Sequence, residues 1–227
     1  MNLKKIIAET YDDIKEKSRI KIAPIRRKKI NDTTFSIISN NCWGGIVYQR
    51  YGLPYASPTA GMYFFAEDYI KFISNLSYYI SIPMSTISID QSKYREIILK
   101  RHHEVFPLGR IDDVEVVFRH YKTPDEAVEK WERRKKRINY NNLIIKFSEM
   151  NLCTDDLINK FLEMPYENKF VFVRRSNMKT DQRLIYYPGY ESMDFLPEDT
   201  KNYSKYINLN ALINEHVIQH SKTGMWE

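Results

Sequence analysis

Cysteine is scarce in this sequence, with only Cys42 and Cys153 among 227 residues. Two thiols so far apart cannot provide the disulfide framework of a small secreted domain, and they cannot form a zinc knuckle. The sequence therefore predicts a reducing, cytoplasmic location.

Long apolar runs are missing as well. No stretch approaches the roughly 20 apolar residues that a transmembrane helix requires, and the N-terminus lacks the pattern of a secretory signal. Residues 1–31 are expected to form a basic helix and linker, with apolar side chains on one face of 3–20. This segment could touch anionic lipid headgroups, although such charge runs are more often solvated surface. We therefore expect at most peripheral contact with a membrane.

Charge of one sign is in modest excess. Lys and Arg number 35 against 29 Asp and Glu, which gives a net charge of +6 and a pI near 9.1. A basic chain favours an anionic partner, such as a phosphate, an acidic glycan, a nucleic acid or a membrane surface, and the charge alone does not choose among them. The apolar content of 43% is sufficient for a sizeable core.

An alternation of β and α patterns in the second half indicates the fold class. Expected strands at 114–118, 142–147 and 169–173 are separated by expected helices at 123–138 and 154–161. Crossovers of this length imply parallel strands, and hence an α/β fold in which a mostly parallel sheet is flanked by helices. The α/β domain would cover 32–227, as one layered unit or as two similar α/β halves joined at a seam near 104–112.

Other elements follow from periodicity and from turn residues. We expect helices at 66–80, 94–100 and 209–219, strands at 84–89 and 184–187, a turn at 105–109, and long loops in 175–207. The helix at 123–138 has a strong start, because Thr123 can cap it, Pro124 follows at the first helical position, and Glu126 can complete a capping box.

The most distinctive stretch is an apolar strand at 35–39 that enters a polar, glycine-containing loop, followed by a predicted helix from Ile46. The loop consists of Asn40, Asn41, Cys42, Trp43, Gly44 and Gly45. The carboxyl end of a strand in an open α/β sheet is where ligands usually bind. The amides could hold ligand hydroxyls, the indole could stack on a sugar or base, and the glycines would let the backbone approach the ligand. A tight turn with Trp43 in the core explains the pattern equally well.

Two further side chains could carry chemistry together with Cys42. Its thiolate would be favoured near a helix N-terminus, and His120, after the strand at 114–118, could act as its base or as a separate acid or base. Lys122 could hold a phosphate. The alternatives are a buried structural thiol and a histidine that only makes a hydrogen bond, and the sequence does not show that Cys42 and His120 meet.

The helix at 123–138 ends in a basic cluster at 130–137. At 100° per residue, Arg134 borders the apolar stripe, so it either extends towards solvent or pairs with a buried acid or a ligand phosphate. The cluster lies at the end of the helix that is normally opposite to a site face. Its other cations fit a solvated last turn.

Several segments resemble a bacterial family of unassigned function that is labelled exopolysaccharide biosynthesis protein. They are Ser39 to Gly45, Ser57-Pro58-Thr59, Pro107-Leu108-Gly109, His120-Tyr121-Lys122 and the run from Lys130 to Asn139. The resemblance spans roughly 33–215. It implies a cytoplasmic protein of capsule or surface-polysaccharide assembly, which handles a nucleotide-activated sugar or acts as a transferase, and it assigns no catalytic residue.

Three functions stay open at this point. The first is a transferase or binding protein for a nucleotide-activated or phosphorylated sugar, the second a nucleic-acid-binding protein, and the third a non-catalytic interaction module. Asp112-Asp113 lacks the Asp-x-Asp spacing typical of metal-dependent glycosyltransferases, so we predict no metal site, and no cofactor is indicated. No recognition-helix motif supports the second function.

Overall fold

The computed structural model describes residues 21–101, 106–176 and 181–219. Its centre is a four-stranded sheet with the order β1-β5-β6-β7, in which every pairing is parallel. The strands are β1 (Ser36–Ser39), β5 (Leu143–Ser148), β6 (Lys169–Val173) and β7 (Leu184–Tyr186). The expected α/β fold and these four strands are confirmed. The helix expected at 3–20 lies outside the described residues.

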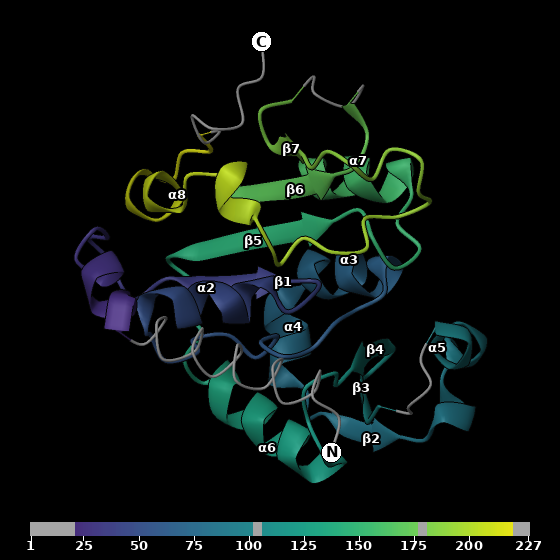
Figure 1. Ribbon diagram of the computed structural model, residues 1–227. Helices are drawn as coiled ribbons and strands as arrows, with labels where there is room; N and C mark the ends of the chain where they lie inside the picture. Colours follow the sequence, from purple (N-terminus) through teal and green to yellow (C-terminus); the bar gives the residue numbers. More distant parts are fainter. Residues whose placement is uncertain (1–20, 102–105, 177–180, 220–227) are drawn as a thin grey trace, which may run out of the picture.

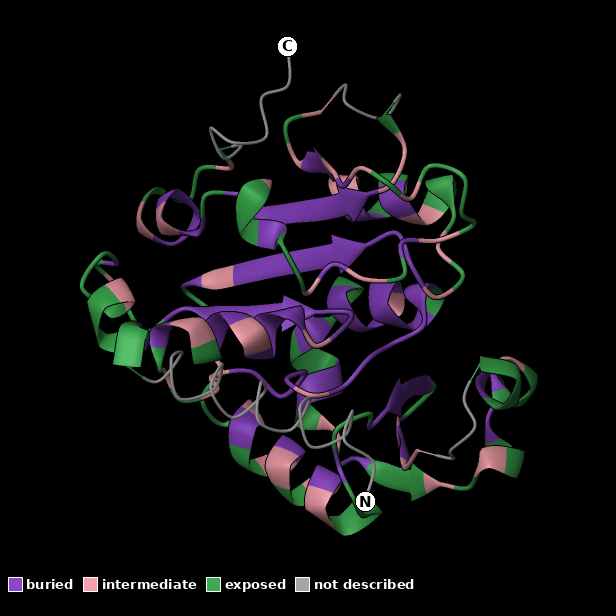
Figure 2. Cartoon of the chain, in the orientation of Figure 1, coloured by how far each residue is buried: buried purple, intermediate pink, exposed green. Residues whose placement is uncertain are grey.

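Helices cover both faces of this sheet (Figure 1). On one face, α2 (Trp43–Tyr51) and α8 (Leu209–Glu215) pack on apolar side chains such as Ile37 and Ile144. On the other, α3 (Ala66–Ser74), α4 (Leu76–Ser81) and α7 (Asp155–Glu163) pack on Ile38 and Ile145. Because successive side chains of a strand point to opposite faces, the apolar runs of β1 and β5 supply both cores. Figure 2 shows the resulting burial of the sheet.

A second, smaller sheet is antiparallel and has the order β2-β3-β4. It consists of β2 (Ser85–Ile87), β3 (Leu108–Ile111) and β4 (Val114–Val117), with α5 (Arg95–Arg101) and α6 (Pro124–Lys135) nearby (Figure 1). The expectation that the strand at 114–118 joins the parallel sheet is therefore wrong. The described residues do not form two similar α/β halves, since one sheet is parallel and the other antiparallel.

The turn expected at 105–109 is displaced along the chain. Leu108 and Gly109 belong to β3, and the chain reverses after Ile111, where Asp112 adopts a left-handed conformation with φ 54°. A two-residue connection between antiparallel strands requires such positive φ values. β2 pairs with β3, so strands from both sides of 104–107 share a sheet; the division of the chain into domains stays a prediction.

The small sheet is attached to α3 by a buried carboxylate. Asp68 is fully buried and accepts a hydrogen bond from the backbone N–H of Glu115 at 2.8 Å, and Lys93 contributes an ion pair at 2.5 Å. A buried carboxylate needs such partners to offset its lost hydration. This contact fixes β4 relative to the parallel sheet, and hence the residues that follow β4.

Helix boundaries follow local chemistry. Thr123 Oγ1 accepts a hydrogen bond from the Glu126 N–H at 3.2 Å, which confirms the predicted start of α6. The helix expected at 66–80 is divided at Asn75, whose φ of −141° and ψ of 58° are not helical. The last helix ends at Glu215, since His216 is left-handed. Short 3-10 turns lie at Ile89–Gln91 and Tyr203–Lys205. No helix in the described ranges is long and apolar enough to span a bilayer.

Candidate functional site

A cavity of about 550 Å³ opens at the carboxyl edge of β1 and β5. The loops after these two strands, the end of α5, the segment after β4 and the segment 195–200 all contribute to its wall. The lining residues are Asn41, Cys42, Ile46, Tyr63, Arg101, Arg119, His120, Met150, Asn151, Phe195, Pro197, Glu198, Asp199 and Thr200. Ligands of open α/β proteins usually bind at this edge, and the volume falls within the range of small-molecule sites, about 300–1,000 Å³.

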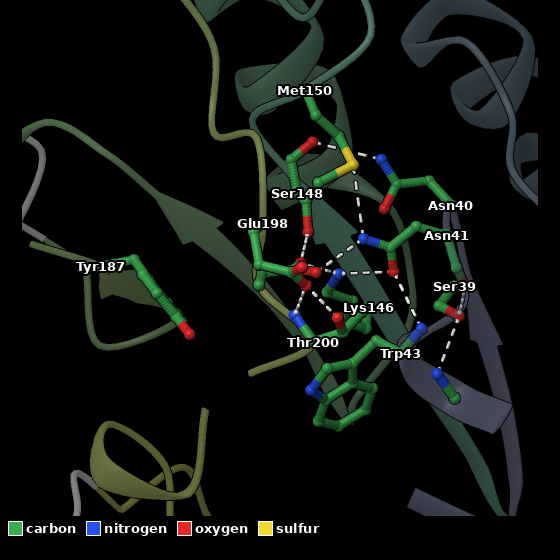
Figure 3. Close-up of polar contacts among 12 residues, drawn as sticks. Ser39, Asn40, Asn41, Trp43, Lys146, Ser148, Met150, Tyr187, Glu198 and Thr200 are labelled. Carbon is green, nitrogen blue, oxygen red and sulfur yellow. Dashed lines mark hydrogen bonds and ion pairs between the residues drawn. The ribbon is translucent and has the colours of Figure 1, made fainter. Parts of the chain in front are cut away.

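The side-chain amides of the two asparagines after β1 form hydrogen bonds within the protein. Asn40 is fully buried and donates from Nδ2 to the Ser148 carbonyl at 3.2 Å. Asn41 donates to Asp199 at 2.8 Å, and its carbonyl oxygen accepts hydrogen bonds from the Lys146 ammonium and the Trp43 N–H (Figure 3). Asn41 still reaches the cavity wall, whereas Asn40 is absent from the lining. The amide of Asn40 therefore cannot contact a ligand there, and that of Asn41 is largely occupied.

A buried ion pair lies beneath the cavity. Lys146 of β5 pairs with Asp199, and the side chains of both are completely buried. Ser148 also donates a hydrogen bond to Asp199, so the carboxylate holds three polar groups, two from β5 and one from the loop after β1. Burial lowers the pKa of Lys146, and the charge of Asp199 opposes that effect. The pair attaches segment 195–200 to the sheet and makes that segment one wall of the cavity.

Trp43 belongs to the core. Its side chain is fully buried, with edge-on contacts to the rings of Phe170, Phe172 and Tyr203. The indole has no exposed surface for stacking on a ligand, so the proposed stacking role is wrong for this residue. The alternative, a tight turn with Trp43 in the core, describes the structure.

The paired glycines serve helix packing. A Cβ on Gly44 would lie 3.0 Å from the Ile37 side chain, whereas one on Gly45 would meet Ala60 at an ordinary 3.5 Å. Both glycines are helical, with φ outside the left-handed region. The absence of a side chain at Gly44 lets α2 begin directly against β1, and Gly45 lines a neighbouring cavity described below.

Cys42 is the N-cap residue of α2, and its Sγ lies 3.8 Å from the Met62 carbonyl oxygen. Burial raises the pKa of the Cys42 thiol to about 12, with Arg119 and Lys146 acting in the opposite direction. The expected stabilisation of a thiolate by the helix is therefore wrong. At neutral pH this residue presents an uncharged thiol to the cavity.

His120 and Arg119 follow β4 and line the same cavity as Cys42. His120 donates its backbone N–H to the Gly61 carbonyl at 3.3 Å. Loss of hydration, and after it the charge of Arg119, lower the pKa of His120 below its usual value. The imidazole is thus neutral near pH 7 and able to accept a proton. The cavity brings together Cys42 and His120, although β4 is not part of the parallel sheet.

The acidic side chains of the cavity wall are paired with lysines, whereas its two arginines form no ion pair within the described residues. Asp199 is neutralised by Lys146, and Glu198 pairs with Lys201 at 3.2 Å. Loss of hydration acts to raise the pKa of Glu198, yet hydrogen bonds from Thr200 and Lys201 lower it overall. Arg101 contacts the amide of Asn151 and the ring of Phe195, and Arg119 the ring of Phe106. Neither arginine forms an ion pair within the described residues, so the cavity favours an anion.

The loop after β5 has an unusual backbone. Asn151 and Leu152 are consecutive residues with positive φ, 53° and 67°. Asn151 is held there because its Nδ2 donates to the Phe64 carbonyl at 3.1 Å and its Oδ1 accepts from Arg101 at 3.1 Å. Such conformations in non-glycine residues are uncommon and are often found at functional sites.

A second cavity of about 420 Å³ adjoins the first, and the two share Cys42, Ile46 and His120. It extends towards α6 and is also lined by Gly45, Gln49, Tyr55, Ala60, Gly61, Tyr121, Glu126, Lys130 and Arg134. The sequence placed the last turn of α6 away from the site, but the structure brings Arg134 to this cavity. Lys122 is exposed and lines neither of the two cavities.

Comparison with known proteins identifies the family to which the chain belongs. Residues 13–220 match the profile of a family described as Domain of unknown function (DUF1919). The chain belongs to this family. It is also similar to an uncharacterized protein of Haemophilus influenzae, with 25% identity over 162 residues, which cover 71% of this chain and 72% of that protein. These matches show the family of the chain and do not indicate an activity.

Sequence reasoning missed four residues of this DUF1919 chain that shape the site: Arg101, Arg119, Lys146 and Asp199. A signal for Lys146 was present, because a lysine within the apolar run of β5 must find a buried partner. Asp199 lies in a segment without periodicity, so nothing local marked it. No three His, Cys, Asp or Glu side chains in the described part of the chain are grouped as metal ligands would be.

Proposed function

We propose that this DUF1919 protein binds a phosphorylated or nucleotide-activated sugar in the 550 Å³ cavity, as a transferase or binding protein of surface-polysaccharide assembly. The observation that carries the proposal is the pair of arginines, Arg101 and Arg119, in a cavity whose acids are already neutralised. Guanidinium groups bind phosphates through paired, charge-assisted hydrogen bonds.

Other groups of the wall suit a sugar or a base. Tyr63 and Phe195 offer aromatic surface, and Asn151 and Thr200 offer polar side chains. Pockets that combine aromatic surface with a few polar groups are typical of small polar ligands. The resemblance to proteins labelled for exopolysaccharide biosynthesis supports the same choice of ligand.

The transferase role would rest on His120. Its lowered pKa keeps the imidazole neutral, so it could take a proton from an acceptor hydroxyl. Cys42 is less suited to nucleophilic attack, because its pKa is raised to about 12. We therefore assign His120 the acid or base role and Cys42 a place in the wall.

The nucleic-acid alternative receives less support. Three cations of the 130–137 cluster are paired with acids of α6: Lys130 with Glu126, Arg133 with Glu129, and Lys135 with Glu132. Arg134 is buried. Much of the cluster is therefore neutralised within its own helix, where nucleic-acid binding would need free cations along a surface.

Calorimetric titration with nucleotide sugars, sugar 1-phosphates and the corresponding free sugars tests the proposal. We expect the phosphorylated compounds to bind and the free sugars to bind far more weakly. Arg119→Gln should weaken binding by about tenfold to a hundredfold, as expected for loss of a charged hydrogen bond. Arg133→Gln, on the exposed side of α6, is the matched control and should leave the affinity unchanged. No binding by any phosphorylated sugar would reject the proposal.

A further inference from the structure

Arg134 is a buried cation that pairs with no anion in the part of the chain that the structure describes. Its side chain lies in α6, and the residue is only 7% exposed. Its Nη1 donates to the Ala60 carbonyl at 2.8 Å and to the Tyr121 hydroxyl. Within the described residues, no carboxylate pairs with it, and its Nε and Nη2 have no hydrogen-bond partner. An arginine that is mostly buried, lines a cavity and has no counter-charge is suited to binding an anion there.

The groups around Arg134 do not cancel its charge. Burial raises the pKa of Tyr121, so its hydroxyl is protonated and uncharged. The remaining acid of the cavity, Glu126, is paired with Lys130 at 3.4 Å. The Tyr55 ring lies 4.6 Å from the guanidinium carbon, which orients the cation without neutralising it. Among the described residues that line the smaller cavity, the charge of Arg134 is therefore not compensated.

The guanidinium is also held in a fixed position. The hydrogen bonds of Nη1 and the ring of Tyr55 restrain it, and Tyr55 is in turn held by a hydrogen bond from Gln49 Nε2 at 2.8 Å. A restrained arginine with free N–H groups loses little entropy when it binds an oxyanion. This preorganisation is typical of a binding site.

The geometry points to a second oxyanion subsite in the 420 Å³ cavity, in which Nε and Nη2 of Arg134 bind a phosphate or carboxylate. Its ligand is an anionic sugar, either phosphorylated or a uronate. The choice of a sugar rests on the proposed function, whereas the oxyanion rests on Arg134 alone. Since both cavities share Cys42, Ile46 and His120, groups bound in the two would meet beside the imidazole.

Crystals of the full chain soaked with tungstate, a heavy phosphate analogue, test the subsite by position. We expect one anomalous peak beside Arg134 and another beside Arg119. A peak at Arg119 alone would overturn the second subsite and leave the proposed function standing. A peak at Arg134 alone would support the subsite and contradict the proposed anion site, and no peak at either would reject both.

A second measurement covers solution conditions and the identity of the anion. Inorganic pyrophosphate, a sugar phosphate and galacturonate are titrated into the wild-type chain, Arg134→Lys and Arg133→Gln. Arg134→Lys keeps the charge but loses the planar donor pair, so we expect about tenfold weaker binding to the second subsite. Arg133→Gln should match wild type. Equal affinity of wild type and Arg134→Lys for every anion would overturn the inference.

Sugar phosphate and galacturonate distinguish the two sources of the oxyanion. If the binding of the sugar phosphate depends on Arg134, the ligand is a phosphorylated sugar. If the binding of galacturonate depends on Arg134, the ligand is a uronate. If only the binding of pyrophosphate depends on Arg134, the result would support the oxyanion subsite and reject a sugar as its ligand.

Discussion

Lys146 and Asp199 form an ion pair in which both side chains are completely buried, although 53 residues separate them in sequence. Lys146 is in the middle of β5, and Asp199 belongs to a segment of irregular backbone. The pair joins the parallel sheet to one wall of the larger cavity. It therefore links the stability of the fold to the shape of the site.

Removal of one partner of this pair should destabilise the protein strongly. Lys146→Met keeps the volume but leaves the Asp199 carboxylate buried without a counter-charge, and we expect a loss of about 3–5 kcal/mol in the free energy of unfolding. Urea denaturation measures it. Lys160→Met, which removes the exposed pair with Asp156, is the control and should cause no measurable change. A Lys146→Met chain as stable as wild type would contradict the role assigned to the pair.

The pKa of His120 should lie below its ordinary value of 6.5. Arg119→Gln removes the neighbouring positive charge and should raise that pKa, while Arg133→Gln should not move it. A titration of the imidazole proton signals by NMR, with His120→Gln for assignment, measures the shift. An unchanged pKa in Arg119→Gln would contradict the electrostatic coupling.

The same group contributes to the pH dependence of stability. A folded-state pKa below 6.5 means that the unfolded chain binds the proton first as the pH falls. Stability should therefore decrease as the pH falls through 6.5 towards the folded-state pKa, and His120→Gln should lose this part of the dependence. Denaturation curves at a series of pH values compare the two chains.

Cys42 should react slowly with alkylating reagents. With a pKa of about 12, its thiolate fraction at pH 8 is on the order of a thousandfold smaller than that of a free cysteine. Iodoacetamide labelling of a Cys153→Ser chain, followed by mass spectrometry, isolates the Cys42 rate. The same reagent on the urea-unfolded chain is the reference. Equal rates in the folded and unfolded chains would show that Cys42 is an activated or freely exposed thiol.

The two glycines that open α2 should respond differently to alanine. A Cβ at Gly44 would lie 3.0 Å from Ile37 and 3.2 Å from the Ser39 hydroxyl, so Gly44→Ala should cost about 1–3 kcal/mol through overpacking. Gly45→Ala meets only an ordinary contact with Ala60, and helix propensity should make it neutral or stabilising by up to about 1 kcal/mol. Thermal and urea denaturation test both. The reverse order of stability would contradict the packing of α2 on β1.

Local patterns were sufficient for most of the elements. The apolar runs of β1, β5 and β6, and the threonine cap of α6, were readable because propensity, capping and periodicity act within a few residues. The strand at 114–118 was also correctly placed in sequence. Its partner was not, because the same β-branched run fits a parallel or an antiparallel neighbour, and only long-range packing chooses.

The site was predictable in part for the same reason. The loop after β1 was identified, since a strand followed by polar residues and glycines is a local signal. The roles of its residues were not, because Trp43 is in the core and Asn40 binds Ser148. Lys122, elsewhere in the chain, is exposed and lines neither of the two cavities. Side chains of identical type bind a ligand or the protein itself according to what packs above them.

The sequence by itself determined the α/β class, the parallel sheet and the loop at the carboxyl end of its first strand, because these depend on hydrophobic periodicity and on local turn chemistry. Only the tertiary structure decided that His120, which follows a strand of the antiparallel sheet, lines the same cavities as Cys42, that Asp199 neutralises Lys146, and that Arg134 is buried with no paired anion among the described residues. Those relationships join residues far apart in the chain, and burial and charge pairing at such distances are properties of the assembled core.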